Sequence, residues 1–302
     1  MLTGILLLDK PLGLSSNGAL QRVKRALRAE QAGHVGSIDP LATGMLPICL
    51  GEATKIAGEI LSGRKRYLFS IALGARTATG DVEGAVVETL PVPSFDRPAL
   101  DAVLGRFTGR QTQIPPMYSA IKRDGQPLYK LARAGVEVER APRDIEIFDF
   151  TVRGFDEASV QLETSCSKGT YIRTLAEDIA RALGTCGHVS LLRRLYVEPF
   201  EGEAMLTLDA VSDLAAAGSL PPLLPADRGV PQLPEVRLTA VATARVVHGQ
   251  AAAVPAEIAP GRVRLYDAQG RFFGIGEADG FGSVQPRRLF VDAAGERPDE
   301  RP

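Results

Sequence analysis

The sequence predicts an α+β protein, and three observations lead to that fold class. Apolar residues recur at helical spacing in two segments that lie far apart in the chain, 15–28 and 171–183. Several short apolar or alternating runs are typical of β-strands. Strands and helices follow one another without a uniform βαβ rhythm, which favours α+β over a doubly wound parallel sheet.

Each element follows from a local pattern. The first helix comes after suitable N-cap residues at 15–17, and its apolar positions are 20, 23 and 27. In the second helix one apolar stripe is formed by Ile172, Leu175, Ala176, Ile179 and Leu183. The strands that we expect in the first part of the chain cover residues 4–8, 67–73, 145–152 and 160–165.

A proline-rich stretch divides the chain into two unequal parts. Five prolines lie between residues 218 and 234, where neither a helix nor a central strand can continue. We interpret the stretch as a linker between a large domain, residues 1–233, and a small β-rich domain, residues 234–292. Short strands are expected at 262–267, 272–276 and 289–291, and residues 293–302 are expected to form a flexible tail.

Composition limits the class of protein. Of the 302 residues, 45% are hydrophobic and 24% charged, which is typical of a soluble globular protein. The three cysteines, Cys49, Cys166 and Cys186, include no Cys-x-x-Cys pair, which favours a reducing compartment and no structural zinc. The apolar run at 5–8 is too short for a signal peptide or a membrane span. We therefore expect a cytoplasmic protein.

Charge is distributed unevenly. The net charge of −1 argues against a highly basic nucleic-acid coat, but the first 66 residues carry nine basic and five acidic side chains. Basic pairs also occur at 122–123, 193–194 and 287–288. Taken alone, each pair is more typical of an ordinary solvated face than of a nucleic-acid contact.

The segment 33–47 is the densest in unusual residues. Its glycines at 33, 36 and 44 and its prolines at 40 and 47 predict a shaped loop in place of a helix or central strand. The loop presents His34 and Asp39, and the proline after Asp39 restricts the backbone of that residue. A single carboxylate on such a loop suggests nucleophilic or general-base chemistry. The alternative is an Asx-turn in a surface loop.

Several motifs, in order, resemble the TruB family of tRNA pseudouridine synthases. Residues 33–44 (GHVGSIDPLATG) are similar to the catalytic motif of that family, with Ile38 where leucine is usual. Further similar stretches are 8–13 (LDKPLG) with 15–17 (SSN), 65–67 (KRY), 167–174 (SKGTYIRT), 191–195 (LLRRL) and 284–289 (VQPRRL). The resemblance covers nearly the whole chain. It implies a synthase domain with a mixed or antiparallel sheet and flanking helices, followed by a small PUA-like β domain.

The resemblance also implies a reaction. Such enzymes isomerise the uridine at position 55 in the TΨC loop of tRNA after flipping it out of the stack. The bond from uracil N1 to ribose C1′ breaks, the base rotates, and C5 joins the same C1′. No redox change or group transfer occurs, so neither a cofactor nor a metal is expected, and the sequence contains no Walker A loop or zinc-ligand spacing.

Roles for the catalytic residues come from the same resemblance. Asp39 is the catalytic aspartate, which either attacks the sugar or removes a sugar proton. Arg173 orients Asp39 and keeps it ionised; the alternative is a surface pair with Glu177. Tyr67 stacks on the uracil with its hydroxyl near C5, unless it is simply a core aromatic. Leu192 forms an apolar wall of the pocket, or else belongs to the core.

The resemblance implies that His34 displaces or replaces flipped nucleotides; alternatively it is a loop histidine bound to the nearby backbone. A metal site at His188 and Cys186 is less expected than a structural role.

RNA contacts are expected from three regions: a thumb at 113–143, the basic helix at 22–28 and the C-terminal domain. The expected contact residues are Lys10, Lys122, Arg123, Lys168, Arg193, Arg287 and Arg288. The partner is tRNA, bound through its T arm and its acceptor stem, with no membrane and no protein partner required, and we expect a monomer.

Other functions remain compatible with the sequence. One is a related synthase that acts on another RNA or inside an RNA-guided complex. A second is an RNA-binding module that helps tRNA to fold, a property that can coexist with catalysis. A third is a hydrolase with an aspartate nucleophile, which would yield a cleaved product.

Overall fold

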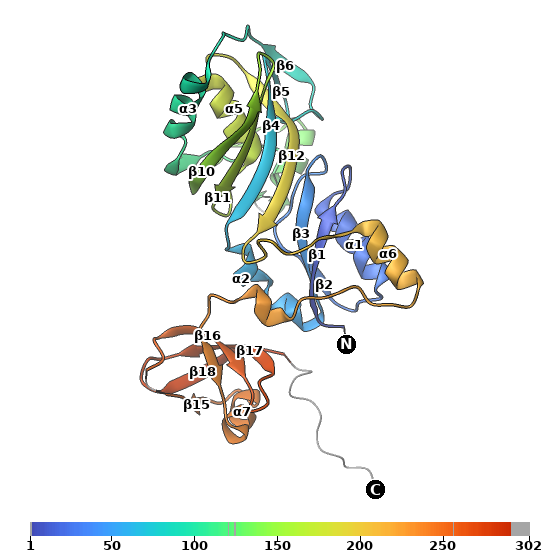
Figure 1. Ribbon diagram of the computed structural model, residues 1–302, viewed down its shortest axis with the longest axis vertical. Helices are drawn as coiled ribbons and strands as arrows, with labels where there is room; N and C mark the ends of the chain where they lie inside the picture. Colours follow the sequence, from blue (N-terminus) through green and yellow to red (C-terminus); the bar gives the residue numbers. More distant parts are fainter. Residues whose placement is uncertain (1, 120, 124, 256, 291–302) are drawn as a thin grey trace.

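The chain folds around two β-sheets, a large one and a small C-terminal one (Figure 1). The computed structural model describes residues 2–119, 121–123, 125–255 and 257–290. The expected tail at 293–302 lies outside the described residues, as do residues 291 and 292.

The large sheet has nine strands in the order β13-β1-β3-β12-β4-β11-β10-β7, with β2 paired to β3. Neighbours are antiparallel except for the β1–β13 and β3–β12 pairs. The predicted α+β class with a mixed sheet is confirmed. The strands are β1 (Gly4–Lys10), β2 (Ala32–His34), β3 (Thr43–Leu50), β4 (Lys65–Leu73), β7 (Gly109–Gln113), β10 (Arg143–Phe155), β11 (Ser159–Cys166), β12 (Gly187–Val197) and β13 (Leu206–Thr207).

Helices cover the two ends of this sheet separately (Figure 1). Helices α1 (Ser16–Ala26) and α6 (Leu208–Ala216) pack on β1 and β3, where Leu6 and Leu8 are buried. Helices α3 (Arg97–Arg106) and α5 (Ile172–Ala182) pack on β4, β10 and β11. The predicted strands and helices of this domain are confirmed. Helix α1 begins as expected, because the Ser15 hydroxyl accepts a hydrogen bond from the Gly18 amide.

Shorter elements connect the strands. After β3 come a 3-10 turn, η1 (Gly51–Ile56), and α2 (Ala57–Leu61), and β5 (Ala75–Thr77) pairs with β6 (Val86–Thr89). The predicted thumb contains a two-stranded hairpin, β8 (Lys122–Arg123) with β9 (Gln126–Pro127), and helix α4 (Leu128–Arg133).

The segment 33–47 contains more regular structure than we expect from its glycines and prolines. Strand β3 lies inside the sheet although it includes Gly44 and Pro47, so the exclusion of a central strand is wrong for 43–47. The Pro47 carbonyl accepts a hydrogen bond from Val35, so its missing N–H also points away from β1. On the edge of β3 that faces away from β1, β12 pairs only with residues 43 and 44, and β2 pairs only with residues 48–50. Pro47 therefore falls in a gap of the ladder.

The C-terminal sheet has five strands in the order β14-β16-β17-β18-β15. The elements are β14 (Glu235–Arg237), α7 (Ala240–Val247), β15 (Ala252–Ala253), β16 (Gly261–Tyr266), β17 (Phe272–Ala278) and β18 (Ser283–Leu289). The last strand lies earlier than the predicted 289–291. The register between β17 and β18 shifts at one point, because Ile275 is opposite Arg288 whereas Gly276 is opposite Pro286. The resulting bulge at Arg287 accommodates Pro286, a residue type that in the sequence argues against a strand here.

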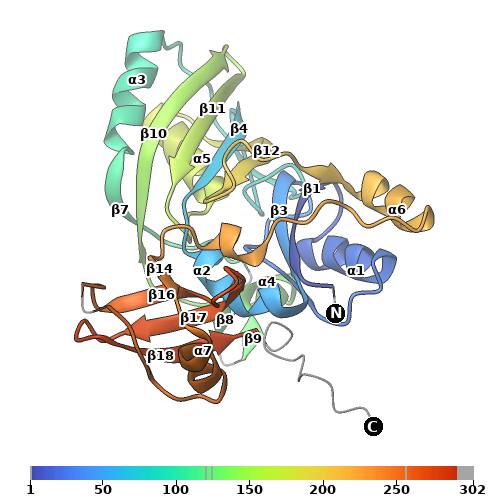
Figure 2. The ribbon, with the colours of Figure 1, turned by 60° about the horizontal axis from the view of Figure 1, so that its bottom comes forward.

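The proline-rich stretch, which we interpret as a linker, is packed against the large sheet. Ile5 and Leu224 exchange two backbone hydrogen bonds of 2.8 and 2.9 Å. Turn η2 (Ala226–Gly229) follows, and Val230 is buried in one core cluster with Ile5 and with Phe290 after β18. The small sheet is thus held against the α2 side of the large sheet (Figure 2).

Candidate active site

The loop that carries Asp39 is fixed on both sides. The buried Ser16 hydroxyl donates to the Ile38 carbonyl (3.0 Å) and accepts from the Ile38 amide (2.9 Å). The Gly13 amide donates to the Pro40 carbonyl (2.8 Å). These bonds hold the residues before and after Asp39, so the start of α1 sets the position of the carboxylate.

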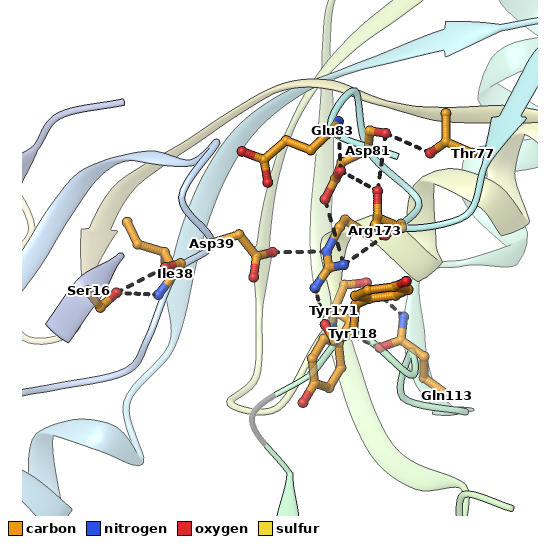
Figure 3. A network of polar contacts seen from close by, with 11 residues as sticks. Ser16, Ile38, Asp39, Thr77, Asp81, Glu83, Gln113, Tyr118, Tyr171 and Arg173 are labelled. Carbon is orange, nitrogen blue, oxygen red and sulfur yellow. Dashed lines mark hydrogen bonds and ion pairs between the residues drawn. The ribbon is translucent and has the colours of Figure 1, made fainter. Parts of the chain in front are cut away.

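Arg173 lies opposite Asp39 and is held by four groups (Figure 3). Its Nε is 2.9 Å from Asp39 Oδ2, and its Nη1 is 3.7 Å from Asp81 Oδ2. The two terminal nitrogens also donate to the carbonyls of Thr79 and Tyr118, both at 2.7 Å. The described contacts include no ion pair with the alternative partner Glu177. The guanidinium is therefore fixed in direction as well as in position.

Two further residues support this arrangement. Asp81 accepts hydrogen bonds from the Thr79 hydroxyl (2.5 Å) and the Glu83 amide (3.0 Å). Gln113 accepts from the Tyr171 amide (2.8 Å) and donates to its carbonyl (3.1 Å), which fixes the start of α5 next to Arg173. Figure 3 shows Asp81 joined to the guanidinium, and Gln113 joined to Tyr171, which precedes Arg173 by two residues.

The electrostatics of Asp39 differ from the expectation in one respect. Burial among protein atoms raises the pKa of Asp39 above its ordinary value, and the nearby Asp81 raises it further. Arg173 opposes this shift by its charge and its hydrogen bond but does not reverse it. The side chain keeps 38% of its surface exposed, against 5% for Arg173. The acid is therefore accessible while its partner is buried.

A cavity of about 730 Å³ brings together the three predicted catalytic residues, Asp39, Tyr67 and Arg173, and the predicted pocket residue Leu192. Tyr67 and Leu192 also belong to the hydrophobic core, with 9% and 6% of their surfaces exposed. Burial raises the pKa of Tyr67. The cavity thus has an apolar wall on the β4–β12 side and an ion pair at its edge.

Basic side chains gather around the same cavity. Lys122 and Lys168, two of the expected RNA contacts, line it, and so do Lys65 and Arg143. The Lys65 ammonium is buried and donates to the carbonyls of Leu61 and Gly63, and burial lowers its pKa to about 8. Arg143, in contrast, is exposed at the start of β10.

His34 lines a second cavity of about 920 Å³. That cavity shares Asp39 and Arg173 with the first, so the ion pair lies where the two meet. His34 Nδ1 is buried and has no hydrogen-bond partner among the described residues, which disfavours the interpretation as a histidine bound to its local backbone. Burial and the charge of Arg194 lower its pKa, which favours the neutral ring.

Other predicted residues lie away from the cavities or are already engaged. Lys10 is completely buried and donates to the carbonyls of Pro11 (2.9 Å) and Leu14 (2.6 Å). Its third acceptor is the Pro40 carbonyl, at 3.4 Å. The expected RNA contact of Lys10 is corrected, because its ammonium faces backbone carbonyls and anchors the Asp39 loop.

Arg193 makes a two-pronged ion pair with Asp9 (2.8 and 2.9 Å), and Arg123 donates to the Glu139 carbonyl (2.9 Å). Arg287 and Arg288 lie on β18, far along the chain, beside a third cavity that Lys55 also lines. His188 contacts the Ala75 carbonyl through Nδ1 (2.7 Å), as a structural histidine would.

Sequence reasoning assigned no role at the site to three residues: Asp81, which lies outside the motifs, and Lys65 and Arg194, which lie inside the motifs 65–67 and 191–195. The turn of Asp81 contains a glycine, Gly80, with a φ of 74°, but glycine turns are common and gave no functional signal. Arg194 is only 1% exposed and lines the first cavity. Aspartate and arginine side chains are rarely fully buried unless they are paired. Their burial therefore marks Asp81 and Arg194 as candidate site residues, and burial can be seen only in the folded structure.

Comparison with known proteins connects this geometry to a family. The family model described as "TruB family pseudouridylate synthase (N terminal domain)" matches residues 24–172, and two TruB C-terminal models match 173–230 and 234–290. The chain is 48% identical over 299 residues to tRNA pseudouridine synthase B of Sodalis glossinidius, covering 96% of this chain and 95% of the relative. The chain belongs to the TruB family. It is therefore a pseudouridine synthase, an isomerase.

Further relatives agree with this membership. The tRNA pseudouridine synthase B of Burkholderia lata is 49% identical, with 97% of this chain and 92% of the relative covered. The TruB chain is also similar to a solved Cbf5-Nop10-Gar1 complex, with a TM-score of 0.73 and 26% identity over 95% of this chain and 84% of the other. A solved H/ACA RNP bound to a substrate RNA has the same fold, with a TM-score of 0.73 and 24% identity over the same shares.

The residues that the structure describes contain neither a metal-binding cluster nor a membrane-spanning helix. Within that part of the TruB chain, His, Cys, Asp and Glu side chains form no group of three or more that could hold a metal ion. None of the helices described there has the length and hydropathy that crossing a membrane requires.

Proposed function

We propose that the protein converts the uridine at position 55 in the TΨC loop of tRNA to pseudouridine, with Asp39 as the catalytic carboxylate. The observation that carries the proposal is the Asp39–Arg173 pair, 2.9 Å apart, at the edge of a cavity lined by Tyr67 and Leu192. At about 730 Å³ the cavity falls within the usual size of ligand pockets, roughly 300–1,000 Å³. Relatives named tRNA pseudouridine synthase B support the choice of tRNA.

The geometry suits a reaction at the ribose. In its ionised form Asp39 acts on the sugar, as a nucleophile at C1′ or as a base toward the C2′ proton. In either route the electron pair of the C1′–N1 bond leaves with the uracil. Arg173 holds the carboxylate toward the sugar, because its other donors are taken by two backbone carbonyls. After rotation of the base, a C5–C1′ bond forms.

The last step restores the aromatic ring. The C5 proton leaves, its bonding electrons return to the ring, and N1 takes up a proton, so product and substrate are isomers. Tyr67 lies on the cavity wall beside Asp39, and we assign it the position against the uracil face. Leu192 completes the apolar wall, which favours a stacked base over water.

Access to C1′ requires that the uridine leave the stacked loop. We assign His34 to the nucleotides next to the flipped base, because the second cavity meets the first at Asp39. Lys122 and Lys168 at the first cavity are placed to contact phosphates there. The small sheet, with Arg287 and Arg288, is assigned to a distant part of the tRNA, the acceptor stem.

We also propose that the protein acts on tRNA without a protein partner, as a monomer in the cytoplasm. Matches to the catalytic and C-terminal family models in one chain support action without a partner. Three buried free cysteines support a reducing compartment.

The test is incubation with an unmodified tRNA transcript, followed by mapping of pseudouridine at single-nucleotide resolution. We expect pseudouridine at position 55 and an RNA of unchanged mass. Modification at another position or in another class of RNA would contradict the proposed substrate. A cleaved RNA would support the hydrolase instead.

A further inference from the structure

Lys65 is a buried cation at the first cavity that the mechanism above does not use. It opens strand β4, two residues before Tyr67, and only 5% of its surface is exposed. Its register partners on the neighbouring strands, Cys166 and Val197, are completely buried. No carboxylate of the described residues lies within ion-pair distance of the Lys65 ammonium, whereas the buried Arg173 has two. Burying a charge without a counter-ion is costly, so the contacts of this one indicate its purpose.

The protein satisfies the Lys65 ammonium only in part. It donates to the carbonyls of Leu61 and Gly63, at the end of α2. An ammonium has three N–H donors, and the described residues supply no acceptor for the third. Lys10 is a contrasting case, because its buried ammonium meets three backbone carbonyls. Lys10 is therefore an anchor, whereas Lys65 keeps one donor for another partner.

Lys65 stands next to Tyr67 on the wall of the first cavity. Residues two apart in a strand project from the same face, about 7 Å from each other, and both of these side chains line the cavity. The uracil is assigned to the face of Tyr67, so the edge of the base, with its carbonyl oxygens O2 and O4, comes within reach of a neighbouring lysine. The ribose is assigned to the other partners, Asp39 and Arg173. A charge on Lys65 therefore acts on the base.

Other cations of the cavity are better suited to phosphates. Lys122, Arg143 and Lys168 line it and are exposed. Exposed cations can contact the hydrated phosphates that position RNA. A buried ammonium beside an apolar wall has little water around it, which strengthens its interaction with a charge that develops during a reaction.

We propose that Lys65 is a catalytic residue that donates a hydrogen bond to a carbonyl oxygen of the uracil and stabilises the negative charge of the base after it leaves the ribose. This role rests on the proposed function, because a detached uracil arises only if the C1′–N1 bond breaks. The bonding pair then stays on the base and is shared by N1, C5 and the carbonyl oxygens. Lys65 keeps its proton, and the negative charge disappears when C5 bonds to C1′.

The ionisation of Lys65 gives this role a signature. Burial and the charges of Arg194 and Lys168 lower its pKa to about 8, whereas Cys166 and Glu198 act in the opposite direction. These groups lie on β12, on β11 and just after each of these strands, and the end of α2 faces the ammonium with two carbonyls. The charged form exists below the pKa, so Lys65 is a cation at neutral pH and loses its charge as the pH rises through about 8.

The first test varies the leaving base in the parent and in Lys65→Met. Single-turnover rates on tRNA with uridine or 5-fluorouridine at position 55 are followed as loss of the starting nucleoside. Methionine keeps the length of the side chain without its charge or donors. On uridine we expect Lys65→Met to lose about 10²-fold in rate, as for the removal of one oxyanion donor. Fluorine withdraws electrons and itself stabilises the detached base, so the loss on 5-fluorouridine should be clearly smaller.

Two control variants accompany this comparison. Lys10→Met removes another buried ammonium, which acts on the reaction only through the Asp39 loop, so its loss of rate should be equal on the two bases. Arg97→Gln removes an exposed arginine that pairs with Asp101, and it should match the parent on both. An equal loss on both bases in Lys65→Met would overturn the proposal and leave Lys65 as a cap of α2. A parental maximal rate with a raised half-saturating concentration would assign Lys65 to a phosphate and would also overturn it.

The second test is the pH profile of the rate at enzyme concentrations below half-saturation, which reports the free enzyme. The parent should lose activity above about pH 8, where Lys65 gives up its proton. Lys65→Arg should recover part of the rate lost in Lys65→Met and should lack this decline, because a guanidinium stays charged. The same decline in Lys65→Arg as in the parent would contradict a role for the Lys65 charge. If Lys65→Met does not fold, the profile of Lys65→Arg decides.

Failure of the proposed function would be distinguishable. A parent enzyme that leaves uridine 55 unchanged but converts another uridine would overturn the proposed position in tRNA. The comparison of the two bases then moves to that other uridine, where the same results decide the role of Lys65.

Discussion

The cavity that Asp39 lines and the C-terminal sheet both carry arginines, but the surroundings of these arginines differ. In the cavity, Arg173 and Arg194 are almost fully buried and are bound by backbone carbonyls in fixed directions. On the C-terminal sheet, Arg287 has a 60% exposed side chain and a single partner, Glu277, at 3.1 Å. Arg271 is likewise 65% exposed and pairs with Asp267 at 2.8 Å.

The difference indicates what each region can do. Arginines with several buried bonds cannot exchange partners cheaply, so they fix atoms for a reaction. Exposed ion pairs contribute only about 0–1 kcal/mol to the free energy of folding, so their arginines can exchange a carboxylate partner for an RNA phosphate. Substitutions in the cavity should therefore change the rate of reaction, and substitutions on the C-terminal sheet should change affinity and its salt dependence.

The largest effect is expected for Asp39→Asn. The amide keeps the size of the side chain but can neither attack the sugar nor accept its proton. We expect the single-turnover rate to fall by at least about 10³-fold, within the range for loss of a catalytic group. Affinity for tRNA should change less than threefold, measured by filter binding. A variant with a rate near that of the parent would remove Asp39 from the mechanism.

A stability test concerns the junction between the two regions. Phe290 is 5% exposed in the core cluster that the sheets share, with its ring 5.2 Å from that of Phe272. Phe290→Ala should lower the free energy of unfolding by about 3 kcal/mol, measured by urea titration. The matched control is Phe281→Ala, because Phe281 is 89% exposed. Equal stability of the two variants would mean that the sheets are not docked as described.

Arg173→Lys should reduce the rate by about 10²-fold, because one ammonium cannot replace the four contacts of the guanidinium. The pH profile supplies a second criterion. Arg173 lowers the pKa of Asp39, so a weaker contact raises that pKa further and moves the acid limb of the rate to higher pH. An acid limb at the same pH as in the parent would separate Arg173 from the ionisation of Asp39.

Asp81→Asn should have a smaller effect, about tenfold in rate, because its oxygen lies 3.7 Å from the guanidinium and the amide keeps an acceptor there. The sign of the pH shift is opposite. Asp81 raises the pKa of Asp39, so its neutralisation lowers that pKa and moves the acid limb to lower pH. Opposite shifts in Asp81→Asn and Arg173→Lys, from pH–rate profiles, would establish the network as electrostatic.

The smallest effect per substituted residue is expected for arginines of the C-terminal sheet. Arg287→Gln combined with Arg288→Gln should weaken tRNA binding several-fold and reduce the slope of log affinity against log salt by about 1.5–2, for two phosphates. The reaction rate at saturation should stay at the parent value. The control is Arg97→Gln, on α3 at the opposite end of the molecule from the small sheet (Figure 1). An unchanged salt slope would contradict phosphate contacts by this pair.

Much of the fold could be predicted because local patterns coincide with local structure. The N-cap at Ser15 and the apolar stripes of α1 and α5 depend only on neighbouring residues, and both helices form where expected. Strands β3 and β18 were harder, because Pro47 and Pro286 are tolerated only where the ladder is interrupted. Such a gap is a property of the neighbouring strands, so it is not visible in the segment itself.

The candidate site was predictable to the extent that its residues occur in motifs. The resemblance selected Asp39, Tyr67, Arg173 and Leu192, and the fold places all four at one cavity. It could not separate Lys10, a buried anchor, from Lys168 at the cavity, because both are lysines in motifs. Asp81 comes from the segment between β5 and β6, outside the motifs, and Arg194 lies in the same motif as Leu192. The roles of both depend on distances that only the assembled fold defines.

The comparison of the two regions is tested most directly by one single-turnover titration, run on Asp39→Asn and on the Arg287→Gln, Arg288→Gln double variant. Each titration of enzyme against tRNA yields a maximal rate and a half-saturating concentration. We expect a collapsed maximal rate with an unchanged half-saturating concentration for Asp39→Asn. For the double variant we expect an unchanged maximal rate with a raised half-saturating concentration. A double variant with a collapsed maximal rate, or an Asp39→Asn variant that fails only by losing affinity, would contradict these expectations.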